Sequence, residues 1–187
     1  MNILQKVLKD NELPEGICSL INGDYKVGEL MTKDHRVALI SATGSTRMGQ
    51  IVGSAVASRF GKALLELGGN NAIIITPDAD ADIYLTASVF GAVGTAGQRC
   101  TTTRRLIIHE SIYEDVKKKL ANAYAQLRIG NPLSPDNHVG PLIDKDAVNN
   151  YLLSIEQAKQ EGGKMVVEGG VLSGSDYESG CYVKPCI

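Results

Sequence analysis

The stretch Ala63-Leu64-Leu65-Glu66-Leu67-Gly68-Gly69-Asn70-Asn71-Ala72-Ile73-Ile74-Ile75 decides the class of fold. It holds two short apolar runs, residues 63–65 and 72–75, separated by a carboxylate, two glycines and two asparagines. Short apolar runs bounded by turn residues indicate buried strands. The break between them, near residues 66–70, is the natural boundary of a first layer of structure.

Upstream of this stretch, apolar strand-like runs alternate with helical patterns. Alternation of this kind is typical of an α/β fold with a parallel sheet whose strands are covered on both faces. We expect helices at residues 3–12, 27–32 and about 46–60, and strands at residues 17–21 and 37–40.

Downstream, the pattern continues with longer helices. We expect a helix that starts at Pro77–Asp80 and a second that starts with a capping box at Ser111 and Glu114 and runs to about residue 127. A third helix is expected at residues 144–161, with strands at residues 105–109, 164–168 and 181–187.

Composition narrows the classes of function. The 187 residues are 43% apolar and 21% charged, as in an ordinary globular protein, and the net charge of -2 argues against nucleic acid or an anionic membrane as main partner. No apolar run approaches the ~20 residues of a membrane span. Four cysteines without a C-x-x-C pair predict reduced thiols, in the cytoplasm or the mitochondrial matrix. The three histidines are isolated, so no metal site is expected.

Two reactive side chains stand out. Glu66 ends an apolar run, either as a solvated strand end or as a base near an apolar pocket, where its pKa would rise. Cys100 lies in the loop Gly97-Gln98-Arg99-Cys100-Thr101, either as a small buried side chain or as a nucleophile whose thiolate Arg99 would favour. A thiol nucleophile with a separate carboxylate base is what an acyl-thioester mechanism requires.

The run Gly44-Ser45-Thr46-Arg47-Met48-Gly49 joins an expected strand to an expected helix. The N–H groups of such a helix start suit a phosphate. The alternative is an ordinary turn capped by Ser45 or Thr46, since the chain has neither a G-x-G-x-x-G fingerprint nor the lysine of a P-loop.

Taken together, Thr43–Thr46, Leu65–Gly69 and Gly97–Cys100 resemble the aldehyde dehydrogenase superfamily in order and spacing, and residues 66–72 and 94–105 are similar to its antiquitin branch. The resemblance covers essentially the whole chain. It implies an α/β fold in which residues 1–66 are the C-terminal part of a Rossmann-like, NAD-binding domain. Residues 67–187 would be the N-terminal part of an α/β catalytic domain.

The resemblance also implies a mechanism. Cys100 attacks an aldehyde, hydride passes to NAD, and Glu66 activates the water that hydrolyses the thioester; the Cys100 backbone N–H forms part of an oxyanion hole. Thr101 and Arg99 would touch the substrate, with Arg99 on the distal carboxylate of a semialdehyde. The residues expected at the cofactor are Gly28, Glu29, Gly44, Ser45, Gly49 and Leu67.

The chain departs from the family pattern in several places. Ala42 stands where the family usually has Phe. The family's upstream Asn and Lys and its downstream Glu have no counterpart in these residues. We therefore expect a central fragment of a homotetrameric parent enzyme, and the alternative is a truncated chain without catalytic activity. A CoA-acylating enzyme is disfavoured because Glu66 supplies the base that hydrolysis requires.

Overall fold

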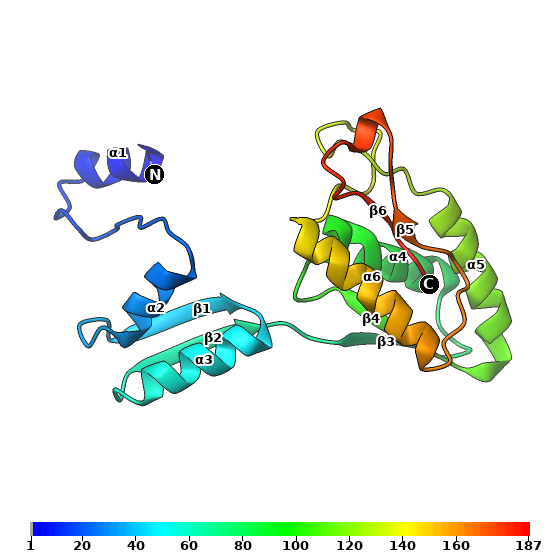
Figure 1. The fold of residues 1–187 in the computed structure, drawn as a ribbon, viewed down its shortest axis with the longest axis horizontal. Coiled ribbons are helices and arrows are strands. Elements are labelled where there is room, and N and C mark those ends of the chain that lie inside the picture. Colours follow the sequence, from blue (N-terminus) through cyan, green and yellow to red (C-terminus); the bar gives the residue numbers. More distant parts are fainter. Residues whose placement is uncertain (1) are drawn as a thin grey trace. The chain divides into compact units, whose positions relative to one another are not determined.

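The computed structural model describes residues 2–187 and divides into two compact units, Met1–Leu67 and Gly68–Ile187 (Figure 1). Both units combine helices with parallel strand pairs, so the expected α/β class with parallel pairing is confirmed. The assignment of residues 1–66 to cofactor binding and of residues 67–187 to catalysis stays a prediction.

The first unit is built on two parallel strands. It contains α1 (Asn2–Asp10), α2 (Tyr25–Lys33), β1 (Leu39–Gly44), α3 (Thr46–Ala57) and β2 (Lys62–Leu67). β1 and β2 pair so that Thr43 lies opposite Glu66 and Gly44 opposite Leu67. α3 connects the two strands and packs on both, and α2 packs on α3 (Figure 1).

The start of α3 follows from three residues. Ser45 is the N-cap, and its hydroxyl accepts a hydrogen bond from the Met48 N–H at 3.1 Å, as the alternative interpretation of residues 44–49 had it. Gly49 is buried, and a Cβ placed there would lie 2.5 Å from a methyl carbon of Leu67. The missing side chain therefore lets the helix approach β2.

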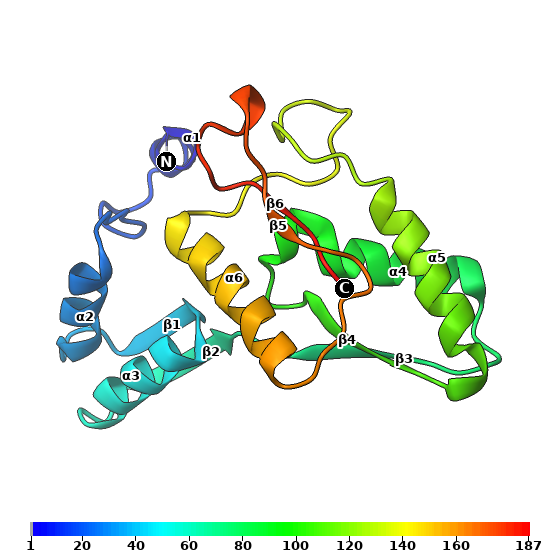
Figure 2. The ribbon, with the colours of Figure 1, turned by 45° about the vertical axis from the view of Figure 1, so that its right-hand side comes forward.

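The second unit holds three longer helices around another parallel strand pair, β3 with β4 (Figure 2). A small antiparallel pair, β5 with β6, lies near the C-terminus. The elements in chain order are β3 (Asn71–Ile75), α4 (Ala81–Val93), η1 (Gly94–Gly97), β4 (Thr103–Ile108), η2 (Glu110–Ile112), α5 (Tyr113–Ala125), α6 (Lys145–Gln160), β5 (Gly170–Val171), η3 (Ser175–Tyr177) and β6 (Val183–Lys184).

The core of the second unit consists of three contiguous apolar clusters, because each helix buries one face against the strands or against the C-terminal segment. The first joins β3, α4 and α5, the second joins α4 and α5 to the following loop, and the third joins α6 to β6. Their buried members are Ile75, Tyr84, Val116 and Leu120; Val93, Tyr124 and Val139; and Leu142, Val148 and Val183.

Three expectations about local structure were wrong. Residues 17–21 form no strand, and Ile17, Leu20 and Ile21 are more than half exposed, because no described strand pairs with this run. The capping box at Ser111 and Glu114 does not form: α5 begins at Tyr113 after a short 3-10 turn, and its N-cap makes no side-chain bond.

The third wrong expectation is a strand at residues 164–168. The N–H groups of Val166 and Val167 donate to the Ile187 carbonyl at 2.8 and 3.0 Å, and the Ile187 N–H donates to the Val167 carbonyl at 3.1 Å. Hydrogen bonds to a single residue do not make a β-ladder. In the part of the chain after α6, regular strands are therefore limited to β5 and β6. The strand expected at residues 181–187 is accordingly reduced to two residues.

Within residues 2–187, no helix has both the length and the apolar character needed to cross a membrane. The same residues contain no group of three or more His, Cys, Asp or Glu side chains arranged to hold a metal ion.

Candidate active site

Cys100 lies in a tight turn just before β4. The Thr102 N–H donates to the Arg99 carbonyl at 3.1 Å, which closes a four-residue turn from Arg99 to Thr102. The buried Thr102 hydroxyl in turn accepts the Arg99 N–H at 3.0 Å. Cys100 and Thr101 occupy the two central positions and are exposed. The turn therefore presents a free thiol at its tip.

The chain enters this turn through a left-handed segment. Thr95, Ala96 and Gly97 have φ angles of 55°, 52° and 71°. A residue with a Cβ pays about 1–2 kcal/mol for this conformation, and such strain persists where the surroundings over-determine the backbone. Gln98 supplies part of that constraint: its side-chain oxygen accepts the Ile143 N–H at 2.9 Å, and its amide donates to the Thr95 carbonyl at 3.2 Å.

Asn71, at the start of β3, contacts the turn from the other side. Its side-chain nitrogen donates to the carbonyls of Cys100, at 2.7 Å, and of Thr102, at 3.1 Å. The guanidinium of Arg105 donates to the Asn70 carbonyl at 2.7 Å. Within the second unit, side-chain hydrogen bonds thus join the Gly68–Asn71 segment to the cysteine turn.

The backbone at the tip of the turn leaves two donors unused, the N–H groups of Cys100 and Thr101. Among residues 2–187, no group accepts a hydrogen bond from either of them. A free N–H beside a nucleophilic thiol is placed to stabilise negative charge on an oxygen of a group bonded to that thiol. The geometry of the turn is compatible with a thiol nucleophile that carries its own oxyanion donor.

Arg99 points to the end of α4. Its terminal nitrogen donates to the Phe90 carbonyl at 2.8 Å, and the guanidinium carbon lies 4.7 Å from the centre of the Phe90 ring. A Cβ on Gly94 would overlap the end of the same guanidinium, which would then have to shift. Arg99 adds a second hydrogen bond to the Phe90 carbonyl, which already accepts the Gly94 N–H, and stacks on the Phe90 ring. Its Nε is buried and has no partner among the described residues.

The other expected catalytic group, Glu66, belongs to the first unit. It is exposed on β2, opposite Thr43, and the next residue, Leu67, lies opposite Gly44. Gly44, Ser45, Glu66 and Leu67 therefore gather at the carboxyl ends of two parallel strands. In open α/β sheets this is the edge at which ligands bind.

Gly28 and Glu29 lie on α2. The Glu29 carboxylate forms a 2.5 Å ion pair with Lys33 one turn along the helix. A Cβ on Gly28 would meet no atom within 4 Å. The ion pair with Lys33 accounts for the carboxylate of Glu29, whereas no neighbouring atom requires a glycine at Gly28. The expected contact of both residues with the adenosine part of a cofactor stays a prediction.

The sequence reasoning gave no role to the three residues that hold the cysteine turn: Asn71, Gln98 and Thr102. Asn71 and Gln98 lie inside the motifs that carry the resemblance, so their positions were known but not their contacts. The available signal was a polar side chain at the first position of an apolar strand, which has to find a partner when the strand packs.

The chain matches the sequence pattern of the aldehyde dehydrogenase family over residues 1–187 and belongs to that family. It is 52% identical to α-aminoadipic semialdehyde dehydrogenase of Rattus norvegicus and 51% identical to that of Bos taurus, each over 185 residues. Both alignments cover 99% of this chain and 34% of the relative, so the chain spans about a third of the length of these proteins.

Solved structures of other family members have the same fold. HpcC from Thermus thermophilus superposes with a TM-score of 0.89 at 33% identity, over 98% of this chain and 37% of that protein. Betaine aldehyde dehydrogenase from Staphylococcus aureus, in complex with NAD+, superposes with a TM-score of 0.91 at 27% identity, over 98% and 37% of the two chains.

Proposed function

We propose that the full-length protein containing this chain oxidises an aldehyde to a carboxylate with NAD, through a thioester on Cys100. The observation that carries the proposal is the exposed Cys100 thiol at the tip of a hydrogen-bonded turn, beside a backbone N–H that no described residue uses. Membership of the aldehyde dehydrogenase family and the likeness to NAD+-bound structures support it.

In this reaction the Cys100 thiolate adds to the aldehyde carbon, and the carbonyl oxygen becomes an oxyanion that the Cys100 N–H can stabilise. NAD, when bound, would supply the hydride acceptor. Loss of hydride from this carbon leaves a thioester on Cys100. Glu66 then takes a proton from a water molecule, which adds to the thioester carbon. The carboxylate leaves and the sulfur is released as thiolate.

The residues at the strand ends fit the cofactor. The N-terminus of the 12-residue helix α3 offers unpaired N–H groups, and Gly44 and Ser45 place no long side chain in front of them. Gly44 and Ser45 would hold the pyrophosphate, the Leu67 backbone would face the nicotinamide amide, and Gly28 and Glu29 would lie toward the adenosine. Gly49 contributes indirectly, because it lets α3 approach β2.

The roles of Cys100 and Glu66 are tested by NADH formation in the full-length protein. Cys100→Ala should abolish it. Glu66→Gln should allow a burst of about one NADH per site followed by slow turnover, because acylation proceeds but hydrolysis lacks its base. A burst followed by wild-type steady turnover would show that Glu66 is not the base.

We further propose a semialdehyde with a distal carboxylate as substrate, of the α-aminoadipic type, supported by the 52% identity to an enzyme named for that substrate. Arg99 would pair with the carboxylate by exchanging its Phe90 contacts for a charge-assisted bond. Arg99→Ala should raise KM more for a carboxylate-bearing semialdehyde than for a neutral aldehyde of equal length. Equal losses on both substrates would assign Arg99 to the support of α4 alone.

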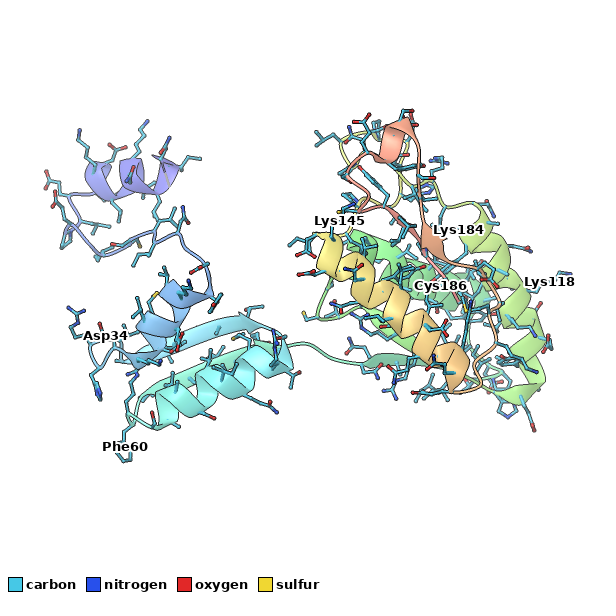
Figure 3. All side chains as sticks on the ribbon, viewed as in Figure 1. Asp34, Phe60, Lys118, Lys145, Lys184 and Cys186 are labelled. Carbon is cyan, nitrogen blue, oxygen red and sulfur yellow. The ribbon has the colours of Figure 1, made fainter. Side chains whose placement is uncertain are left out.

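The second candidate is that the 187-residue chain by itself is not catalytic. Large apolar side chains are strongly exposed, among them Phe60 at 98%, Leu133 at 90% and Ile143 at 84%; Figure 3 shows Phe60 extending away from the end of α3. Such exposure indicates surfaces that other segments cover. The two candidates are compatible, since the first concerns the full-length protein. An NAD-reduction assay on the 187-residue chain tests the second: turnover that Cys100→Ala abolishes would refute it.

For the full-length protein we propose a homotetramer located in the cytoplasm or the mitochondrial matrix. Light scattering on the purified protein tests the assembly, and a mass close to that of one or two subunits would refute it. Fractionation of cells tests the compartment.

A further inference from the structure

We infer that Asn71 is the positioning residue of the nucleophile: its side-chain amide fixes the turn that carries Cys100. This role rests on the proposed function of Cys100. It adds a residue that touches neither aldehyde nor cofactor and acts only through the cysteine backbone.

The Asn71 side chain makes two hydrogen bonds to the backbone near Cys100. Its NH2 group has two protons, and it donates to the Cys100 carbonyl at 2.7 Å and to the Thr102 carbonyl at 3.1 Å. These two carbonyls flank Thr101. One planar amide therefore fixes the Cys100–Thr101 peptide within the turn and the Thr102–Thr103 peptide that leads from the turn into β4.

The hydrogen bonds within the turn do not link its backbone to a neighbouring strand. The Thr102 N–H to Arg99 carbonyl bond and the Thr102 hydroxyl to Arg99 N–H bond close the turn on itself. Neither bond reaches outside the turn. The Arg99 side chain does reach α4, at the Phe90 carbonyl, but it holds no backbone group of the turn. Asn71 is different because it belongs to β3, which is anchored by the buried side chain of Ile75 and paired with β4. It ties the turn to the rigid part of the unit.

The orientation of the Cys100 peptide matters for chemistry. Asn71 holds the Cys100–Thr101 peptide, which adjoins the Cys100 Cα atom. It thereby limits the directions open to the Cys100 Cα–Cβ bond and to the preceding peptide, which carries the Cys100 N–H. A misplacement of about 1 Å in a reacting group can cost about 10²-fold in rate. Loss of the two Asn71 hydrogen bonds should therefore slow acylation of Cys100 more than it weakens substrate binding.

The pairing of β3 with β4 is irregular at Asn71, which supports a special role for this residue. Asn71 pairs with Thr103, but the next residue, Ala72, pairs with Arg105, so a bulge places an extra residue in β4 at this point. Bulges re-aim side chains next to functional sites. In the bulged strand, Arg105 donates to the Asn70 carbonyl at 2.7 Å, which fixes the backbone just before Asn71.

The test uses Asn71→Asp, which keeps the shape of the side chain, removes both donors and sets a carboxylate against two carbonyl oxygens. Asn71→Ala removes the side chain without adding charge. The matched control is Asn70→Asp, which adds the same charge one residue away and leaves the Asn70 carbonyl for Arg105. We expect the rate constant of the NADH burst to fall at least about tenfold in both Asn71 variants. KM for the aldehyde and the affinity for NAD should change less than about threefold, and Asn70→Asp should resemble the wild type.

A second measurement is independent of activity. Hydrogen exchange of the Thr102 N–H, which closes the turn, should become at least about tenfold faster in Asn71→Asp, while exchange in α5 stays as in the wild type. Faster exchange throughout the unit would show a general loss of stability instead and would overturn the inference. So would an active wild type whose burst rate is unchanged in both Asn71 variants.

The two proposals fail in different ways. If the wild-type full-length protein forms no NADH, the proposed function is wrong, and the positioning role falls with it. If the wild type is active and the Asn71 variants match it, the function stands and the role of Asn71 is refuted.

Discussion

Gly49 is the residue whose replacement tests the packing of the first unit most directly. It is buried on α3, and a Cβ there would lie 2.5, 2.6 and 3.1 Å from three carbons of the Leu67 side chain. Gly53, one turn later on the same helix, would place its Cβ 3.4 Å from a methyl carbon of Leu65, an ordinary contact. The same substitution, Gly→Ala, is therefore expected to have opposite signs at the two positions.

The magnitudes follow from two terms. Replacing Gly by Ala inside a helix stabilises by up to about 1 kcal/mol, and this term acts at both positions. Overpacking at Gly49 forces Leu67 to move and costs about 1–3 kcal/mol. Gly49→Ala should therefore destabilise by about 0–2 kcal/mol, and Gly53→Ala should stabilise by about 1 kcal/mol.

Urea unfolding followed by circular dichroism measures both variants, alone and combined with Leu67→Ala. In the Leu67→Ala background the overpacking term vanishes, so Gly49→Ala should become stabilising, with a coupling of about 1–3 kcal/mol between the two sites. If Gly49→Ala stabilises the protein with Leu67 intact, as Gly53→Ala does, the contact with Leu67 is not the reason for this glycine. The reasoning about α3 and β2 would then be refuted.

Three further predictions concern the second unit. Thr95→Gly should raise the free energy of unfolding by about 1 kcal/mol, because Thr95 is left-handed with a φ of 55°. Thr86→Gly within α4 should lower it by about 0.3–0.5 kcal/mol, the difference in helix propensity; equal signs in urea unfolding would contradict this. Burial raises the pKa of Tyr124 to about 12, above its ordinary value of 10.0. The contribution of neutral Tyr124 to the free energy of unfolding should therefore be complete below about pH 10 and be lost between about pH 10 and 12, where only the unfolded state ionises. Tyr124→Phe should remove this part of the pH dependence of unfolding. Asp144→Ala should destabilise by about 1 kcal/mol, because Asp144 caps α6 through a 2.8 Å bond, while Asn149→Ala on the same helix should not; thermal unfolding compares the two.

The parts of the fold that follow from local pattern were accessible from the sequence. The apolar runs at residues 63–65 and 72–75 are the centres of β2 and β3, and Ser45 caps α3, as the alternative interpretation of residues 44–49 had it. These features depend on hydrophobic periodicity and on short-range hydrogen bonds, and both involve residues that are close together in the sequence. The apolar run at residues 17–21 misled the same reasoning, because an isolated strand is not stable without a partner.

For the candidate site, too, the residue types could be predicted from the sequence but their contacts could not. The residue types and the spacing of Glu66 and Cys100 were visible in the sequence, as was the glycine-rich run before α3. The contacts were not, since Asn71 reaches a turn that lies 29 residues further along the chain. A hydrogen bond of that separation exists only after β3 and β4 pair.

The sequence by itself determined the α/β class, the alternation of elements and the family, because these depend on composition, period and motif order. The tertiary structure decided how the cysteine is held: the turn from Arg99 to Thr102, the left-handed entry at Thr95 and the amide of Asn71. The reason is physical. Local propensities act between neighbours along the chain, whereas the orientation of a thiol is set by groups that packing brings together from distant positions.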